Sequence, residues 1–237
     1  MVHLFSYADH FFNYHKGGSP MKRSKPVLAP QLSPVEDLED LACRAREDDA
    51  DLECLLCNRL TLTAAALDGL NFRSVRFSHC RLLDCDFSRT GFQDVVFECC
   101  DCSNSLFSDC FFQRVSFAEC KGVGANLHKS AQQDVLFDRC ALKYANLDGS
   151  RLRALRFQGC DMEGLSLSEC KLSGLELADC RLVGTSFYKT ALTGVDLTSC
   201  TLSGPVFSDT AWELKGAIVD LYQAAALAKR FGVVIRE

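Results

Sequence analysis

The sequence lacks a long hydrophobic run, an evident secretory signal and a strong net charge. None of its apolar stretches reaches the length of about 18 residues that a membrane-spanning helix needs, which excludes such a helix. The first twenty residues carry histidine and aromatic side chains in place of one apolar segment, so we expect no secretory signal. Lysine and arginine total 26 against 31 aspartate and glutamate, which excludes both a generally basic nucleic-acid binder and a polyanion.

Histidine is scarce, and its positions predict no catalytic site. Three of the five histidines (His3, His10 and His15) lie in the first twenty residues, and only His79 and His128 fall further along. The spacing pairs neither of these two with a serine or cysteine nucleophile. The segment Lys121-Gly122-Val123-Gly124 lacks the spacing and the closing Lys-Ser or Lys-Thr of a phosphate loop. We therefore expect neither an enzyme nor a bound cofactor.

A period of five residues is the strongest feature of the sequence. It runs through residues 50–214, in 33 consecutive units. The third residue of each unit is apolar, as in Phe72 and Leu82, except at Gly122 and Gln132. The first residue is small or medium-sized, and the other three are mostly polar. Most of the chain must therefore repeat one five-residue structural unit.

This period fits neither a helix nor an ordinary sheet. In an α-helix, residues five apart are rotated by about 140°, so the apolar side chains would wind around the cylinder. In a flat strand, a spacing of five would place successive apolar residues on opposite faces. What remains is a chain that turns once per unit and points its first and third residues inward. The sequence therefore predicts a solenoid.

A second period indicates the cross-section of this solenoid. Cysteine recurs every twenty residues from Cys80 to Cys200, and valine or leucine recurs at the same interval from Val75 to Val195. Four units therefore complete one coil, so the solenoid has four sides and stacks like residues as ladders. At about 4.8 Å per coil, the 33 units predict about eight coils and a rod about 40 Å long.

The units resemble those of a known family. Ala50-Asp51-Leu52, Ala125-Asn126-Leu127 and Ala145-Asn146-Leu147 match the pattern A(D/N)LXX of the pentapeptide repeat proteins, and residues 50–214 follow its looser form. The resemblance implies an all-β fold, a right-handed quadrilateral β-helix. The handedness comes from the family and not from the spacing.

The segment before the rod is predicted to form a helix that covers the first coil. Ser33 to Glu36 has the spacing of a capping box, with proline at the first helical position. The apolar side chains that follow at helical spacing are Val35, Leu38, Leu41, Ala42 and Ala45. We therefore expect an N-terminal capping helix within residues 33–49.

Residues 1–32 are expected to form a disordered or non-native leader and arm. Four of the five prolines lie between Pro20 and Pro34, beside a Lys-Arg-Ser-Lys cluster, and this composition is typical of a flexible arm. Lys16-Gly17-Gly18 is what a ribosome-binding sequence AAAGGAGG would encode in frame, and Met21 follows at a suitable distance. We hypothesise that Met21 is the native start. Codons that lack GGAGG at positions 16 to 18 would contradict this.

Residues 215–237 are predicted to close the other end of the rod. Asp220 can cap a helix that runs through Phe231 and stops at Gly232. Its expected docking face comprises Leu221, Ala224, Leu227, Ala228 and Phe231. Such a helix would hide strand edges that otherwise invite aggregation. The segment also resembles the closing segment of quinolone-resistance members, which implies a homodimer through Leu221, Tyr222, Leu227 and Phe231.

The cysteines and the two exceptions in the core each allow a plain and a functional interpretation. Most of the 15 cysteines occupy inward positions, so we expect small buried hydrophobes and no bound metal. Their number without a secretory signal indicates reduced thiols and a cytoplasmic location. Cys54 with Cys57, and the cluster Cys99, Cys100 and Cys102, lack the second pair of a zinc site and point in opposite directions. Gly122 and Gln132 indicate either a bulge with an internally bonded amide or a kink that serves recognition.

The outward residues divide into four sides according to their position in the coil. The first acidic side has six acids against three bases, and its acids are Asp68, Asp86, Asp109, Asp148, Glu169 and Asp209. The second acidic side has the same balance, and its acids are Glu98, Glu119, Asp138, Glu176, Asp179 and Asp196. The basic side sets Arg73, Arg114, Arg151, Arg153 and Lys171 against Asp94 and Asp134. The fourth side is balanced.

Two classes of function remain open. Family members similar to this chain imitate duplex DNA, occupy the DNA site of DNA gyrase or topoisomerase IV, and protect it from quinolones or peptide toxins. The resemblance implies that the two acidic sides bind such a partner, with no direct contact to nucleic acid or membrane. The basic side and the lack of large inserted loops argue against this. The alternative is a general scaffold with another partner, and mixed charge is also what solubility alone would produce.

Overall fold

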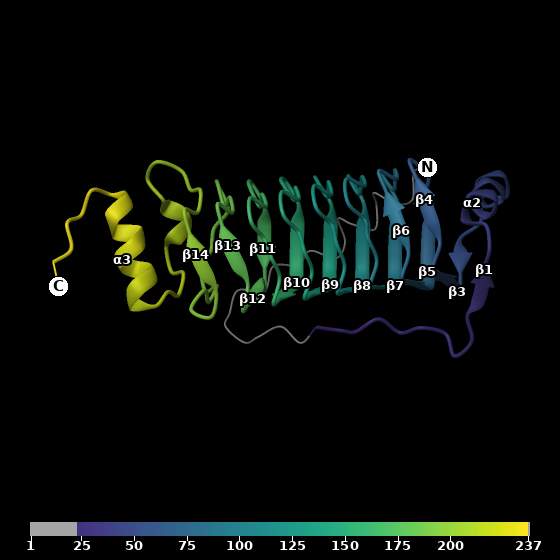
Figure 1. Cartoon of the computed structure of the whole chain (residues 1–237), viewed down its shortest axis with the longest axis horizontal. Coiled ribbons are helices and arrows are strands. Elements are labelled where there is room, and N and C mark those ends of the chain that lie inside the picture. The colour runs from purple at the N-terminus through teal and green to yellow at the C-terminus, as the bar shows by residue number, and fades with distance from the viewer. Residues whose placement is uncertain (1–22, 237) are drawn as a thin grey trace.

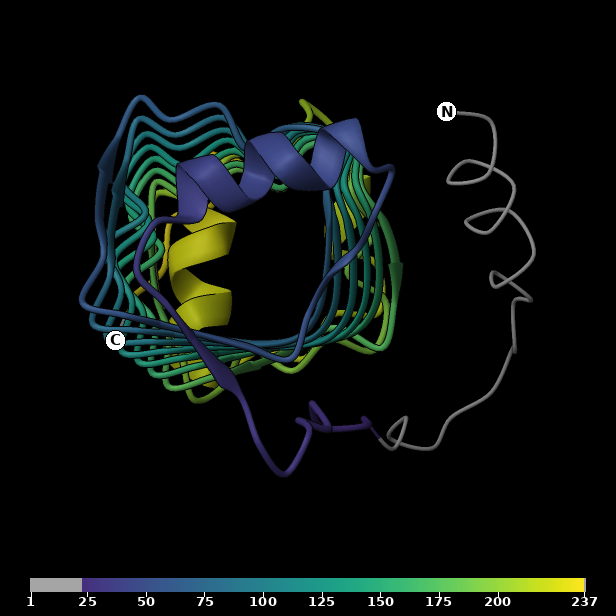
Figure 2. The same ribbon diagram turned by 90° about the vertical axis from the view of Figure 1, so that its right-hand side faces the viewer.

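The computed structural model describes residues 23–236, which form a four-sided rod of stacked coils with a helix at each end (Figures 1 and 2). The strands are β1 Ser33–Val35, β2 Leu52–Glu53, β3 Leu55–Asn58, β4 Thr61–Thr63, β5 Asn71–Ser78, β6 Arg81–Leu83, β7 Gly91–Glu98, β8 Phe111–Ala118, β9 Ala131–Asp138, β10 Arg151–Gln158, β11 Lys171–Ser173, β12 Glu176–Ala178, β13 Arg181–Val183 and β14 Thr201–Ser203. The helices are α2 Leu38–Glu47, the 3-10 helix η1 Trp212–Leu214 and α3 Leu221–Arg230. No helix within residues 23–236 has the length and apolar character to cross a membrane.

The strands pair in parallel with an offset of one coil. Asn71 of β5 lies beside Gly91 of β7, which lies beside Phe111 of β8. The isolated bridges from Ala66 to Asp86 and from Asp86 to Leu106 keep the same interval on another side of the rod. The predicted coil of four units and the predicted β-helix are therefore confirmed.

The chain turns at the fifth residue of nearly every unit, where φ is positive. At Ser74, Asp94 and Arg114, for example, φ is 55°, 56° and 52°. This left-handed conformation costs a residue other than glycine about 1–2 kcal/mol. The cost is tolerated because every turn lets both flanking segments pair with the coils above and below. The turn is also why residues five apart can all face inward.

Stacked phenylalanine rings fill much of the interior. The rings of Phe77 and Phe97 have centroids 4.7 Å apart, and those of Phe97 and Phe117 are 4.6 Å apart. A second stack joins Phe72, Phe92 and Phe112 at 5.4 and 5.1 Å. Offset or edgewise contact between such rings contributes about 0.5–1.5 kcal/mol beyond the burial of area. The predicted ladders of like residues are thus present, and they make the rod stiff.

The coil that contains Gly122 and Gln132 has neither a bulge nor a kink. Gln132 pairs in register with Phe112 and Leu152, and its Nε2 donates to Ser130 Oγ at 2.9 Å. The amide is therefore bonded internally, as expected, but the expected bulge is wrong because ladder pairing continues through the strand. Gln132 Oε1 is buried without a hydrogen-bond partner.

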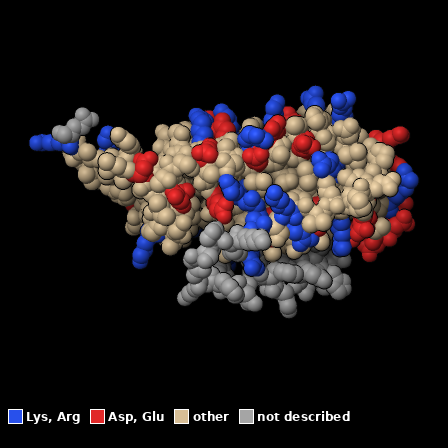
Figure 3. Space-filling view, turned by 90° about the horizontal axis from the view of Figure 1, so that it is seen from below, with Lys and Arg blue, Asp and Glu red and all other residues tan. Residues whose placement is uncertain are grey.

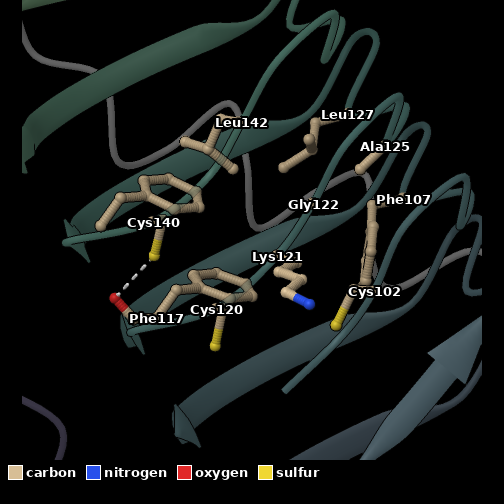
Figure 4. A pocket seen from close by; sticks show the side chains of 11 residues that line it. Cys102, Phe107, Phe117, Cys120, Lys121, Gly122, Ala125, Leu127, Cys140 and Leu142 are labelled. Atoms are coloured by element: carbon tan, nitrogen blue, oxygen red, sulfur yellow. Dashed lines mark hydrogen bonds between the residues drawn. The ribbon is translucent and has the colours of Figure 1, made fainter. Parts of the chain in front are cut away.

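Gly122 leaves a small cavity where other coils have a side chain. The cavity measures about 20 Å³, and its wall includes Cys102, Phe117, Leu127 and Leu142 (Figure 4). It has room for about one water, but its apolar wall offers that water too few polar partners. The missing side chain therefore costs packing and creates no recognition feature.

The N-terminal end differs from the sequence prediction. Ser33–Val35 is strand β1, which pairs with β3, so the capping box predicted at Ser33 is wrong. Helix α2 begins at Leu38, and its N-cap is Asp37, whose side chain accepts the N–H of Asp40 at 3.0 Å. Pairing with the open edge of the first coil outweighs the local helix signal because it satisfies backbone groups on both segments.

The arm is also more ordered than its composition predicts. Residues 23–32 run along the outside of the rod, from the level of β10 back towards β1 (Figure 1). Three of their backbone N–H groups bond to side chains of the rod. The proposed start at Met21 and most of the predicted leader lie outside the described residues.

At the C-terminal end, α3 has the predicted N-cap but docks through another face. Asp220 forms a capping box with Gln223, and Gly232 follows the helix with φ of 76°. Leu227 packs against the core, as expected, but Leu221, Ala224 and Phe231 are exposed, so the predicted docking face is largely wrong. Gln223 is the residue that α3 buries, because its amide can bond to carbonyls at the end of the rod.

Candidate functional site

Most thiols lie inside the rod. All 15 cysteines are free, and only Cys43, Cys54 and Cys99 are not buried. Burial raises the pKa of Cys57 to about 12, while its neighbour in the CxxC spacing, Cys54, is partly exposed. Within residues 23–236 no group of three or more His, Cys, Asp or Glu side chains is placed to hold a metal. Most of the described cysteines therefore lack the exposure that reactive thiols have.

Buried thiols donate hydrogen bonds to backbone carbonyls, and this explains their position. Cys140 Sγ donates to the carbonyl of Phe117 at 3.4 Å (Figure 4). The hydroxyl of Ser150 makes the same contact with the carbonyl of Leu127 at 3.0 Å. In each case the acceptor lies 23 residues earlier in the chain. At these sites the first position of the unit holds a small donor, and this accounts for cysteine there without redox or metal chemistry.

The two histidines within the described residues lie on different sides of the rod. His79 Nδ1 is 2.9 Å from Ser78 Oγ, and this contact is exposed. The backbone N–H of His128 donates to Asn126 Oδ1 at 3.1 Å. The structure thus brings one serine hydroxyl to a histidine, but as sequence neighbours at the exposed end of β5 and not in a pocket.

The twelve acids predicted to form the binding surface all reach the outside of the rod. None of them is buried. Figure 3 shows one face of the rod, on which acidic and basic side chains are interspersed. The structure therefore offers rows of charge, one coil apart, and does not bring the acids together in one cluster.

Half of these acids are paired with bases. Glu98 bonds to Arg76 at 3.1 Å, and Glu119 lies 2.9 Å from Arg139. The other paired acids are Asp68, Asp138, Glu169 and Glu176. Each exposed pair contributes at most about 1 kcal/mol to stability. Its larger effect is to neutralise the surface charge that a target would meet.

The remaining six acids differ in whether their carboxylates accept hydrogen bonds. Asp196 accepts the hydroxyl of Thr198 at 2.6 Å and its N–H at 2.9 Å, and these bonds lower the pKa of Asp196. Asp148 accepts the N–H of Ser168 at 2.8 Å. Asp86 and Asp179 accept bonds from Ser88 and Gln158. Asp109 and Asp209 are exposed and belong to none of these pairs.

The fourth side holds a small ionic network. Lys143 and Arg181 each contact both Asp161 and Glu163, at distances from 2.5 to 3.3 Å. The hydrogen bond from Arg181, followed by that from Lys143, lowers the pKa of Glu163. These four charges cancel one another. On the fourth side, for which the sequence predicts balanced charge, opposite charges are therefore in direct contact.

The C-terminal end exposes the side chains predicted to form a dimer interface. Leu221 and Tyr222 are 81% and 85% exposed, and Phe231 is also exposed. Leu227 packs against the core instead. Trp212, Ile218 and Val234 add further exposed apolar area near this end. The structure thus places an apolar surface beyond the last coil.

The repeats identify the family. A profile described as the pentapeptide repeat region matches residues 70–147, 90–167 and 132–207. The chain belongs to the pentapeptide repeat family. No curated protein sequence matches it.

Among solved structures, a trypsin-treated form of QnrB1, a plasmid-mediated fluoroquinolone resistance protein, is similar to 77% of this pentapeptide repeat chain. The match covers 92% of that structure, with 18% identity and a TM-score of 0.46. HetL, which is involved in heterocyst differentiation regulation in the cyanobacterium Nostoc, matches 69% of the chain and 84% of its own, with 16% identity and a TM-score of 0.29. Rfr23 from the cyanobacterium Cyanothece matches 78% of the chain over its full length, with 14% identity and a TM-score of 0.25.

One feature of this pentapeptide repeat rod was missed from the sequence. Asp94 and Asp134 appeared only as a dilution of the basic side, but both accept N–H groups of the N-terminal arm. Their recurrence at the fifth position, on either side of Arg114, was the available signal. This recurrence could not predict the contact, because a contact between the rod and a distant arm produces no repeating pattern in the sequence.

Proposed function

We propose that this pentapeptide repeat protein is not an enzyme and binds a protein target through the outer sides of its rod. The observation that carries the proposal is the distribution of reactive and charged side chains among the described residues. Most thiols are buried in the rod and serve the backbone, whereas the charged groups stand outside in rows one coil apart. Such a surface provides shape and charge to a partner. Fifteen free thiols also support a cytoplasmic location.

The most specific candidate partner is DNA gyrase or topoisomerase IV. The resemblance of the closing segment to quinolone-resistance members supports this candidate, as do the two acidic sides, which would imitate the charge of duplex DNA. Asp109 and Asp209 are the acids on these sides best placed to meet a basic surface, because they are exposed and belong to no ion pair described above. We expect no direct binding of nucleic acid and no binding to membranes.

A second candidate is a general scaffold with another partner. The ion pairs favour it, because six of the twelve acids on the two acidic sides already have a basic partner within 4 Å. A surface neutralised in this way imitates phosphate poorly. It still provides a stiff set of polar rows for a partner that recognises shape.

The C-terminal end supports a homodimer as part of either function. Isolated apolar side chains on a surface need no explanation, but a contiguous apolar patch marks an interaction site. Leu221 and Tyr222 begin α3 and Phe231 is its C-cap, so all three exposed side chains lie beyond the last coil. A second copy of the same end would cover them with an identical apolar surface.

A supercoiling assay with purified gyrase, with and without ciprofloxacin, tests the specific candidate. We expect the protein to inhibit or protect gyrase at micromolar concentration, and we expect the effect to weaken as salt rises, because exposed charges are screened. Asp109→Asn should reduce the effect about two- to fivefold, as for one exposed charge pair. Asp84→Asn is the matched control, since Asp84 is also exposed and also has positive φ but lies on the fourth side.

The outcomes separate the candidates. Equal losses from the two substitutions would remove the first acidic side from the interface. Absence of both inhibition and protection at micromolar concentration would end the topoisomerase interpretation and leave the scaffold.

A further inference from the structure

The N-terminal arm contacts a row of side chains at one corner of the rod. The N–H of Ser24 donates to Asp134 Oδ1 at 3.2 Å, and that of Val27 donates to Asp94 Oδ1 at 2.9 Å. The N–H of Ala29 donates to Ser74 Oγ at 2.6 Å. We call Ser74, Asp94, Arg114 and Asp134 the corner ridge. Its four residues occupy the fifth position of successive coils, and all have positive φ.

The spacing of the ridge matches an extended backbone that runs along the rod. Between Ser24 and Val27 the arm advances three residues, or about 10 Å when extended, while the ridge advances two coils, or about 9.6 Å. Between Val27 and Ala29 it advances two residues while the ridge advances one coil. Proline has a fixed φ that suits extended chain and has no N–H of its own. Pro26 and Pro30 lie between and after the three donors, so they support the extended form without interrupting the contacts.

The acceptor at the centre of the ridge is an ion pair. Arg114 donates to both oxygens of Asp94, at 2.7 and 2.6 Å. The side chains of Asp94 and Arg114 are 14% and 24% exposed, less than in the other ion pairs described above. Burial alone would raise the pKa of Asp94, but the hydrogen bonds from Arg114 and Val27 outweigh it and lower the pKa. Asp94 is therefore a charged acceptor that the arm shields from water.

The contacts recognise main chain and not side chains. Val27 is 70% exposed, and Ser24, Lys25 and Gln31 are exposed as well. Arg23 is an exception, since it lies near Glu176 and Asp134 of the rod. The arm thus makes three backbone hydrogen bonds to the rod, and none of the apolar residues within 23–32 is fully buried, while ordering each residue has an entropic cost.

We propose that the corner ridge is a binding site for an extended polypeptide backbone, and that residues 23–32 occupy it as a displaceable strap from the same chain. The site requires free N–H groups two and three residues apart, and the carboxylate of Asp134, which interacts with Arg23, favours a basic segment such as the arm. The ridge lies where the basic side meets the second acidic side, so the strap covers a part of the rod surface. This inference does not depend on which protein the rod binds.

Proline substitutions in the full chain remove the donors. Val27→Pro with Ala29→Pro deletes two of the three N–H groups without changing charge, and Gln31→Pro is the control because Gln31 makes none of the three contacts. Trypsin cleavage after Arg23 reports release of the strap. We expect cleavage at least tenfold faster in the double variant than in the wild type and in Gln31→Pro. Equal rates in all three chains would overturn the proposal.

A labelled peptide of residues 23–35 tests the site directly by fluorescence anisotropy. It should bind the double variant, whose ridge is vacant, at least tenfold more tightly than the wild type, whose ridge is occupied. The peptide with the same two prolines should not bind. Absence of binding to the double variant, or equal binding to both chains, would contradict the proposal. Trypsin protection of the wild type that falls on dilution would place the strap on a second copy and overturn the assignment within one chain.

Discussion

The two ends of the rod are closed in different ways. At the N-terminal end, α2 buries Leu38, Ala42 and Ala45 over the first coil (Figure 2). At the C-terminal end, α3 has the same length and also an aspartate N-cap, but it buries Gln223 and exposes Leu221. The first residues of these two helices are both leucine, and one is 1% exposed while the other is 81% exposed.

The difference shows that each end must solve two problems, an open core and an unpaired backbone edge. At the N-terminal end the tasks are divided, because β1 pairs with the edge and α2 covers the core. At the C-terminal end the segment 213–218 pairs with the last coil, and α3 adds polar contacts to the backbone. Gln223 Nε2 donates to the carbonyls of Leu197 and Cys200, each at 2.8 Å, and Arg230 donates to two more carbonyls. Because α3 docks largely through these polar side chains, much of its apolar surface remains available to a partner.

The largest difference is expected between substitutions at the first residues of the two helices. Leu38→Ala should lower the free energy of unfolding by about 2–5 kcal/mol, as buried leucines do. Leu221→Ala should change it by less than about 0.5 kcal/mol, as exposed residues do. Urea unfolding of the two variants measures both values.

Self-association provides the second half of this test. Leu221→Ala should weaken any dimer seen by sedimentation velocity, whereas Leu38→Ala should leave it intact under conditions where that variant is folded. A dimer unaffected by Leu221→Ala would show that α3 does not form the interface, and equal losses of stability would show that the two ends are closed alike.

Acid should loosen the C-terminal end selectively. Glu213 is buried, its Oε1 accepts the N–H groups of Lys189 and Ser208 at 2.8 and 2.9 Å, and its Oε2 accepts the Ser208 hydroxyl. Burial raises the pKa of Glu213, but the backbone hydrogen bonds outweigh it, so the pKa lies below its ordinary value. A lowered carboxylate pKa contributes stability above the unfolded pKa of about 4.3, and this contribution is lost as pH falls through the folded pKa.

Glu213→Gln measures this contribution. The wild type should be more stable than the variant by about 1–2 kcal/mol at pH 7, because charged acceptors bond more strongly than neutral ones. This difference should shrink as pH falls from 5 to 3 in urea unfolding. Glu47→Gln, at the exposed end of α2, is the control and should show no such dependence. A difference that is constant with pH would contradict the role of the charge.

The middle of the rod provides the smallest effect and a reference for both ends. Gly122 does not have positive φ, and a Cβ there would lie 3.1 Å from Leu142 Cδ2, at the flexible end of a side chain. Gly122→Ala should therefore raise stability by about 0.5–1 kcal/mol, because alanine reduces the entropy of the unfolded chain. Thermal unfolding checks the sign. A loss would show that Leu142 cannot move.

Prediction from sequence succeeded where contacts are between neighbouring units. The inward positions, the twenty-residue coil and the phenylalanine ladders all follow from the two periods, because each unit packs only on the units beside and above it. Prediction failed at Ser33, at Gln132, along the arm and on the docking face of α3. In each case a backbone hydrogen bond to a distant segment, or continued ladder pairing, outweighed a local signal.

The two periods along the chain are sufficient to specify the rod, its four sides and its core, because a period in sequence becomes the same period in space when every coil repeats the last. The closure of the ends, the path of the arm and the set of outward acids that have a basic partner depend on the folded structure. Those outcomes depend on which backbone groups and charges stay unpaired after the coils have stacked, and no local pattern records that.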